Sequence, residues 1–179
     1  MSRAVASEGR WISVWDPLVR IFHWGTVAAV ATAFLTEDVG WLHEGAGYVV
    51  LALLAVRLVW GVVGTRHARF SDFVVAPGRV RSYLGALLRG RAPRHLGHNP
   101  AGGAMIVLLI LLLSLTGGSG WLMTTDRFWG VGWLEQAHEA IAYLLLGAIA
   151  LHVGGALAAS VLHGENLVRA MITGRKRAE

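Results

Sequence analysis

The sequence of 179 residues contains no cysteine. Disulfide bonds, iron–sulfur clusters, thiolate zinc sites and covalently attached c-type haem are therefore excluded. Any metal must instead be bound by histidine, methionine or carboxylate side chains. Charged residues are also few, at 15% of the chain, whereas 55% of the residues are hydrophobic and the mean hydropathy is +0.54. This composition is unusually apolar for a soluble domain and typical of a helical membrane protein.

Four apolar stretches approach or exceed the ~20 residues that a helix needs to cross a bilayer. They cover residues 17–35, 43–63, 101–123 and 134–162. Asp16 fits an N-cap and Pro17 fits a first helical turn, and the stretch that follows is too long for the core of a signal peptide. Because a helix satisfies its own backbone in lipid, the sequence predicts an all-α, integral-membrane four-helix bundle. It shows no repeat, so residues 1–179 are expected to form one domain.

The basic residues are divided unevenly between the two sides of these spans, with 14 of the 16 on one side. These 14 are Arg3, Arg10, Arg20, Arg66, Arg69, Arg79, Arg81, Arg89, Arg91, Arg94, Arg169, Arg175, Lys176 and Arg177. The other side carries Arg127 with Glu37, Asp38, Glu44, Asp126 and Glu135. By the positive-inside rule both termini are cytoplasmic. The arginines border apolar spans, so the expected partner of this charge is the membrane surface and not nucleic acid.

The loop between the second and third spans contains the stretch PGRVRSYLGALLRG, residues 77–90. Its apolar residues recur at helical spacing among arginines. It is predicted to form a short amphipathic helix on the inner leaflet, with a solvated loop as the alternative.

Four of the eight histidines lie within the spans or near their ends, where an ionisable side chain is costly and usually functional. His23 and His152 are expected near the cytoplasmic face, and His43 and His138 near the opposite face. His138 and His152 are 14 residues apart, so they point in nearly the same direction about 21 Å apart along one helix. Two such pairs are what two b-type haems need as axial ligands.

Two other interpretations of the histidines stay open. They could be hydrogen-bonded polar residues that only hold helices together. They could also line a zinc or copper transporter, but none of Met105, Met123 and Met171 lies among them to add a ligand.

Arg57 is the one cation deep in an apolar stretch, 14 residues after His43 and therefore on a similar face of its helix. A buried arginine needs an anionic partner, and a haem propionate would supply one. The alternative is that its side chain extends to the membrane surface. Arg20, close to His23, is a second candidate for a propionate.

A series of motifs covers nearly the whole chain in order. They are FHW (22–24), LHEGAGY (42–48), RLVWGVVG (57–64), LGHNPAGG (96–103), AHEAIAYLLLGAIALH (137–152) and HGENLVRAMITGRK (163–176). With them the chain resembles the bacterial cytochrome b561 proteins and the b-type cytochrome subunits of nickel–iron hydrogenases and formate dehydrogenases. The resemblance implies two non-covalent b haems, one held by His23 with His152 and one by His43 with His138.

The resemblance also implies exchange of electrons with the quinone pool near the inner haem. In the formate-dehydrogenase relatives an Asn–Ala–Gly stretch adjoins the quinone. The comparable stretch here runs from Asn99 to Gly102, with His98 beside it. Pro100 departs from that pattern, and Asn–Pro is also a helix-start signal in its own right.

The chain is therefore expected to be a multi-pass protein of the bacterial inner membrane that relays electrons between quinone and an outer partner. This partner is a c-type cytochrome or a dehydrogenase or hydrogenase subunit, and a homodimer among the membrane lipids is also compatible with the sequence. Such a protein is an electron carrier more than a complete enzyme. A stand-alone oxidoreductase that oxidises superoxide is the main alternative, although acidic outer loops disfavour an anionic substrate.

Overall fold

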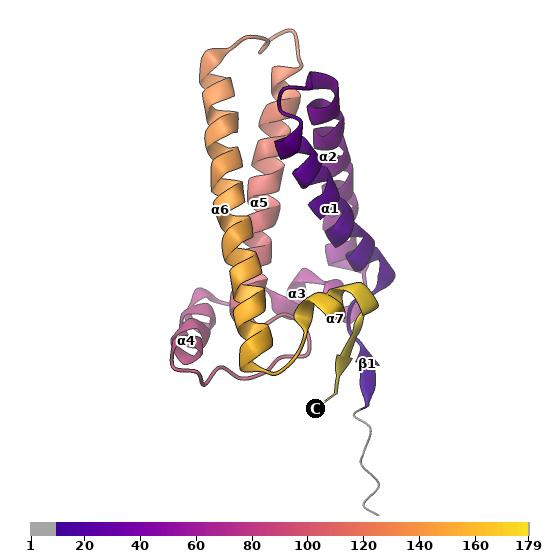
Figure 1. Ribbon diagram of the computed structural model, residues 1–179, viewed down its shortest axis with the longest axis vertical. Coiled ribbons are helices and arrows are strands. Elements are labelled where there is room, and N and C mark those ends of the chain that lie inside the picture. Colours follow the sequence, from indigo (N-terminus) through magenta and orange to yellow (C-terminus); the bar gives the residue numbers. More distant parts are fainter. Residues whose placement is uncertain (1–9, 179) are drawn as a thin grey trace, which may run out of the picture.

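The computed structural model describes residues 10–178, so Arg3 lies outside the described residues. Four of its helices are long and apolar enough to cross a membrane. They are α1 (Pro17–Leu35), α2 (Gly40–Val63), α5 (Pro100–Met123) and α6 (Gly132–Leu162), and they run along the long axis of the molecule (Figure 1). The predicted four-helix membrane bundle is confirmed, and each predicted span ends within three residues of a helix end.

The first span begins where the sequence predicts, because Asp16 caps it. Its Oδ1 accepts a hydrogen bond from the Val19 N–H at 2.9 Å, and Pro17 occupies the first helical position. Its Oδ2 accepts from Trp60 Nε1 at 3.1 Å and from Thr65 Oγ1 at 2.6 Å. Burial acts to raise the pKa of Asp16, but these hydrogen bonds outweigh it and lower that pKa. Asp16 therefore joins the start of α1 to the end of α2.

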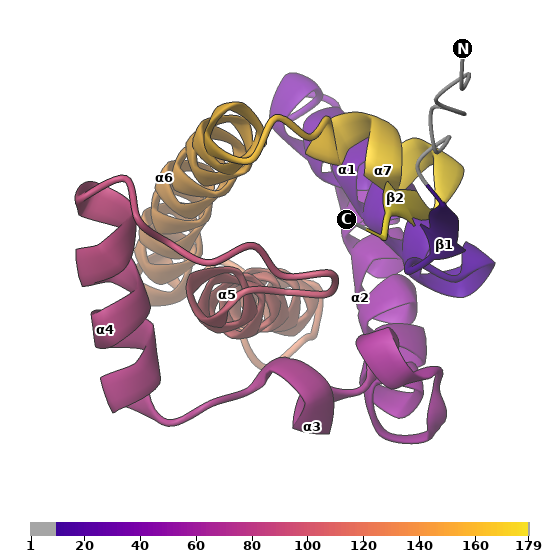
Figure 2. The same ribbon diagram turned by 90° about the horizontal axis from the view of Figure 1, so that it is seen from below.

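The four spans pack in chain order, α1 on α2, α2 on α5 and α5 on α6. Leu54, Leu112 and Leu145 lie at the centre of the core with smaller residues such as Ala29 and Ala148. Helices α1 and α6 lie on the same side of α5 when the bundle is seen from below (Figure 2), but they make few direct contacts. The facing sides of α1 and α6 therefore do not pack against one another.

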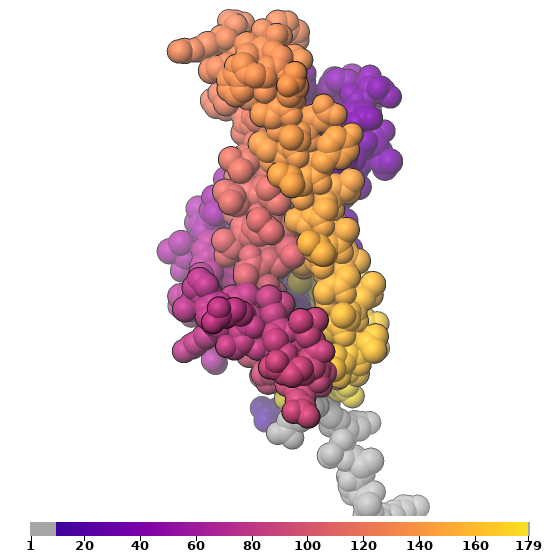
Figure 3. Space-filling model, turned by 90° about the vertical axis from the view of Figure 1, so that its left-hand side faces the viewer, coloured from indigo at the N-terminus to yellow at the C-terminus, as the bar shows by residue number. Residues whose placement is uncertain are grey.

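Short elements gather at one end of the bundle. They are β1 (Trp11–Ser13), η1 (Arg66–Ala68), α3 (Phe70–Phe73), α4 (Pro77–Leu88), α7 (Leu167–Thr173) and β2 (Arg175–Arg177). This end is named the basic end, and the end with the α1–α2 turn (36–39) and the α5–α6 loop (124–131) is named the acidic end. Helix α4 confirms the helix predicted within residues 77–90 and packs against α5 (Figure 3). The positive-inside rule predicts that the basic end faces the cytoplasm.

A two-stranded antiparallel ribbon, which the sequence did not predict, joins the two ends of the described chain. Strand β1 pairs with β2 so that Trp11 lies opposite Arg177 and Ser13 opposite Arg175. Beside it, Val14, Trp15 and Val19 pack with Ala170 of α7 in a second small core. The ribbon and α7 therefore close the basic end through tertiary contacts.

A buried ion cluster fastens the ribbon to the loop before α5. The Lys176 ammonium, only 3% exposed, donates to Glu165 Oε2 at 3.1 Å and to the His95 carbonyl oxygen at 3.0 Å. The Arg94 guanidinium donates to Glu165 Oε1 at 3.0 Å and also to the Arg177 carbonyl. Glu165 thus accepts from two cations that come from different parts of the chain.

Candidate functional site

The first pair of histidines, the basic-end pair, joins α1 to α6. The ring centroids of His23 and His152 lie 6.4 Å apart, with 51° between the ring planes. The Nδ1 atom of His23 is buried and has no hydrogen-bond partner within residues 10–178. These rings face one another across the region where α1 and α6 make few contacts.

The second pair, the acidic-end pair, joins α2 to α6. The ring centroids of His43 and His138 lie 6.0 Å apart, with 72° between the planes. His43 Nδ1 lies 2.9 Å from the Ala33 carbonyl oxygen of α1, and His138 Nδ1 lies 3.0 Å from Ser119 Oγ of α5. The structure therefore brings the histidines together in the two combinations predicted from their depth.

The hydrogen bonds of the acidic-end pair determine which ring nitrogen carries the hydrogen. A carbonyl oxygen can only accept, so His43 Nδ1 must donate to Ala33. The Ser119 hydroxyl donates its one hydrogen back along α5, where the Leu115 carbonyl lies 2.8 Å away, and so it accepts from His138 Nδ1. Both imidazoles then keep an unprotonated Nε2, the form in which histidine binds a metal.

The spacing of each pair suits one metal held between two imidazoles. A metal-bound Nε2 lies about 2.0 Å from the ion and the ring centre lies about 1 Å farther out, so two opposed rings should be about 6 Å apart. The observed separations are 6.4 and 6.0 Å. Within residues 10–178 no group of three or more histidine or carboxylate side chains converges as zinc sites require. The donor sets therefore fit haem iron, which needs only two axial ligands from the protein.

Several glycines lie near the four histidines in the sequence, and one of them makes room for an imidazole. A Cβ atom added at Gly120 would lie 3.1 Å from Cε1 of His138, so this position makes space for that ring. At several other glycines near the histidines an added Cβ would meet no described atom within 4 Å. They are Gly45, Gly47, Gly147, Gly154 and Gly155. Gly47 lies one turn from His43 on the same face of α2, whereas Gly45 and Gly154 point away from the histidine next to them on their helix.

Arg57 lies inside the bundle and does not extend to the surface. It is 3% exposed, and its guanidinium carbon lies 4.9 Å from the centre of the Phe70 ring. A cation–π contact of this kind stabilises the charge only in part. The Nη1 atom is buried without a hydrogen-bond partner among the described residues, so the side chain still lacks an anionic partner.

The remaining predicted residues lie around the basic end. Asn99 caps α5, because its Oδ1 accepts from the Gly102 N–H at 2.7 Å, and this agrees with the helix-start interpretation of Asn–Pro.

The His98 ring lies between Trp15 and Phe73, with ring centres 4.5 and 4.7 Å away. Burial, and secondarily the nearby Arg57, lower the pKa of His98 to about 3, so this ring is neutral at pH 7.

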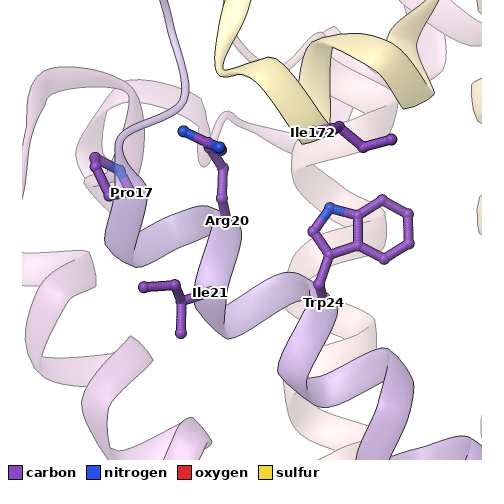
Figure 4. Close-up of a pocket in the computed structure, with 5 residues that line it drawn as sticks. All are labelled: Pro17, Arg20, Ile21, Trp24 and Ile172. Atoms are coloured by element: carbon purple, nitrogen blue, oxygen red, sulfur yellow. The ribbon is translucent and has the colours of Figure 1, made fainter.

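Arg20 lies on α1 one turn before His23, about 60° from it around the helix. It lines a cavity outside the bundle with Pro17, Ile21, Trp24 and Ile172 (Figure 4). The predicted site residues thus separate into the two histidine pairs, a buried arginine and two groups near the basic end.

Sequence reasoning missed Ser119 and Phe70. Ser119 orients His138, and Phe70 packs on Arg57. A signal for Ser119 is present in the sequence, because it is a polar residue near the end of the third span, at the depth of His138. Which way it points depends on the rotation of α5 relative to α6, and hydropathy does not report that rotation.

Comparison with known proteins agrees with this geometry. A family model described as prokaryotic cytochrome b561 matches residues 14–174, which include all four spans and all four histidines. No curated protein and no solved structure gave a match. The chain belongs to the prokaryotic cytochrome b561 family, whose members are multi-pass membrane proteins that bind b-type haem and transfer electrons.

Proposed function

We propose that the protein holds two b haems, one between His23 and His152 and one between His43 and His138, and moves electrons across the bacterial inner membrane. The observation that carries this proposal is the presence of two separate imidazole pairs at haem-ligand spacing, one toward each end of the bundle. A bis-histidine b haem supplies reversible one-electron chemistry and has no open coordination position. The protein therefore acts as an electron relay.

The residues around each pair have distinct tasks in this proposal. The histidines hold the iron from opposite helices, and His43 and His138 are kept in the required tautomer by Ala33 and Ser119. The apolar spans exclude water from the path between the pairs. Arg57 supplies the positive charge that a propionate of the basic-end haem requires.

The exchange with quinone is proposed at the basic end, close to His98 and Asn99. The Oδ1 of Asn99 is occupied by the cap of α5, but none of the hydrogen bonds within residues 10–178 uses its Nδ2. That amide N–H group is therefore the one that Asn99 can offer to a quinone carbonyl. A Cβ atom added at Gly102 would lie 3.3 Å from Asn99 Oδ1, so glycine at this position keeps the space beside Asn99 free.

The outer partner is proposed to dock at the acidic end. This end exposes six carboxylates and one cation, and no described ion pair neutralises them. They are Glu37, Asp38, Glu44, Asp126, Glu135 and Glu139, with Arg127. Such a field attracts a cationic c-type cytochrome or a basic electron-transfer subunit, and it repels superoxide.

Proteoliposomes that contain quinol test the whole route. The purified protein is expected to show b-type absorption bands with two haems per chain, and to pass electrons from quinol to a cationic c-type cytochrome added outside. Added salt should slow this transfer, because it screens the attraction to the acidic end. Ferricyanide, an anionic acceptor, should show the opposite salt response. Stoichiometric zinc or copper without b-type bands would contradict the proposal, and so would transfer that does not depend on quinol.

Replacing Arg57 by glutamine tests the propionate contact. Loss of a buried positive charge disfavours the reduced haem, so the midpoint potential of the basic-end haem should fall by on the order of 50 mV. A redox titration followed in the visible spectrum measures both haems together. Arg69→Gln, a substitution of an exposed arginine at the same end, is the matched control and should leave both potentials unchanged. Equal shifts of the two haems in Arg57→Gln would argue against the contact.

A further inference from the structure

A cavity outside the bundle lies between the start of α1 and α7, at the basic end. Its volume is about 560 Å³, and its lining residues are Pro17, Arg20, Ile21, Trp24 and Ile172 (Figure 4). Ile21 is 68% exposed and Ile172 is 54% exposed, so the cavity opens away from the helical core. Apart from Arg20 and the indole N–H of Trp24, its walls are apolar side chains.

This cavity is separate from the basic-end pair of histidines. Pro17, Ile21 and Trp24 recur at helical spacing along one face of α1, whereas His23 is rotated by about 100° from Trp24. The Trp24 indole N–H is directed to α7, where it donates to the Met171 carbonyl oxygen at 3.4 Å. The cavity is therefore lined by residues of α1 and α7, and none of them is a predicted haem-ligand histidine.

The guanidinium of Arg20 lies close to Gly174, the residue that follows α7. Gly174 takes a left-handed conformation, with φ of +78°, and a Cβ atom added there would lie 3.4 Å from Arg20 Nη1. The Nε atom of Arg20 is buried and has no hydrogen-bond partner within residues 10–178. A donor in that state is destabilising unless an acceptor from outside the chain completes it.

The surroundings favour a ligand with net negative charge. A second, smaller pocket of about 220 Å³, between α7 and β2, is lined by residues that include Arg169, Arg175 and Arg177. The carboxylate of Glu165, which also lines that pocket, already forms ion pairs with Arg94 and Lys176. The end of α1 where Arg20 lies is also the level at which lipid phosphates meet a spanning helix.

We infer that this cavity binds one anionic phospholipid of the adjoining leaflet. Its phosphate accepts hydrogen bonds from Arg20, and one acyl chain lies along Ile21, Trp24 and Ile172. A neutral quinone head group would leave the charge of Arg20 uncompensated. The apolar walls of the site, Ile21 and Trp24, lie on a different face of α1 from His23, and Arg20 lies between these two faces.

Thermal unfolding of the full-length, haem-loaded protein in detergent micelles tests this site. Micelles doped with phosphatidylglycerol should raise the apparent melting temperature by about 3 °C over micelles doped with phosphatidylcholine. The difference should disappear in Arg20→Gln, which removes the phosphate contact. It should also disappear in Ile172→Trp, which fills the cavity from an exposed position. Arg69→Gln, at an exposed arginine that does not line the cavity, should keep it.

Four results would overturn the inference. The first is an unchanged phosphatidylglycerol effect in both cavity variants. The second is an equal effect of inorganic phosphate alone, which would make the site a simple anion site. The third is displacement of the lipid effect by a short-chain quinone, which would make the cavity a quinone site. The fourth is a shifted haem potential in Arg20→Gln with the lipid effect retained, which would assign Arg20 to a propionate.

Discussion

Replacing His138 by alanine is expected to remove one of the two haems and to leave the other bound. His138 and His43 are the acidic-end pair, and an iron with a single axial imidazole loses half of its attachment to the protein. The basic-end pair should be unaffected, because His152 lies about 21 Å farther along α6. A pyridine haemochrome assay should give one haem per chain, and a redox titration should show one transition in place of two.

The matched variant is His152→Ala, which should lose the other haem. The two variants are then distinguishable by which of the two midpoint potentials survives. If both substitutions removed the same haem, or if each removed both, the pairing of helices proposed for the ligands would be wrong.

A milder change at the same site tests the tautomer argument. Ser119→Ala removes the acceptor of the His138 Nδ1 hydrogen, and loss of such a partner typically weakens metal binding about 10- to 100-fold. The acidic-end haem should therefore dissociate first when the protein is titrated with apomyoglobin as a haem acceptor. Ser114→Ala is the control, because Ser114 donates to the Ile110 carbonyl on the same helix and does not bond to a histidine.

Glu165→Gln is expected to lower the free energy of unfolding by about 3–5 kcal/mol at pH 7, because it leaves a buried ammonium without a carboxylate. Lys176, at 3% exposure, would keep only neutral acceptors, the His95 carbonyl and the new amide oxygen. The melting temperature should fall accordingly. The double variant Glu165→Gln with Lys176→Met should recover much of the loss, since no unpaired charge then remains buried. A double variant as unstable as the single one would show that the cluster does not act through charge pairing.

The contribution of Glu165 should also depend on pH in a defined direction. Burial acts to raise the pKa of this carboxyl, but the hydrogen bonds from Arg94 and Lys176 outweigh it, so the pKa in the folded protein lies below its usual 4.5. Its stabilisation is therefore complete above the unfolded pKa and is lost as the pH falls through the folded one. Melting curves between pH 7 and pH 3 should show a steeper loss for the unmodified protein than for Glu165→Gln. Glu44→Gln, at an exposed carboxylate, should follow the unmodified protein.

The parts of the fold that could be predicted from the sequence are those governed by hydropathy and helical period. Span lengths follow from the apolar runs, and the depth of each histidine follows from its distance to a span end. These two quantities were enough to pair His23 with His152 and His43 with His138. Of the short elements at the basic end, α4 was predicted, but α7 and the ribbon were missed because they are stabilised by contacts between residues far apart, such as Trp15 with Ala170.

The prediction that Arg20 contacts a propionate stays a prediction. Three residues separate it from His23, which suggested a shared ligand. In the folded chain the two side chains are about 60° apart around α1, and Arg20 also lines the cavity beneath α7. Arg57, 14 residues from His43, is the cation that the fold buries within a membrane span.

The placement of one histidine of each pair on α6 has a consequence for biosynthesis. During translation the hairpin of α1 and α2 enters the membrane first and presents His23 and His43, one for each haem. Both missing ligands then arrive together, on the last span to be made. Neither cofactor can be held from two sides until α6 is inserted, so under the proposed ligation a truncated or stalled chain carries no stably bound haem.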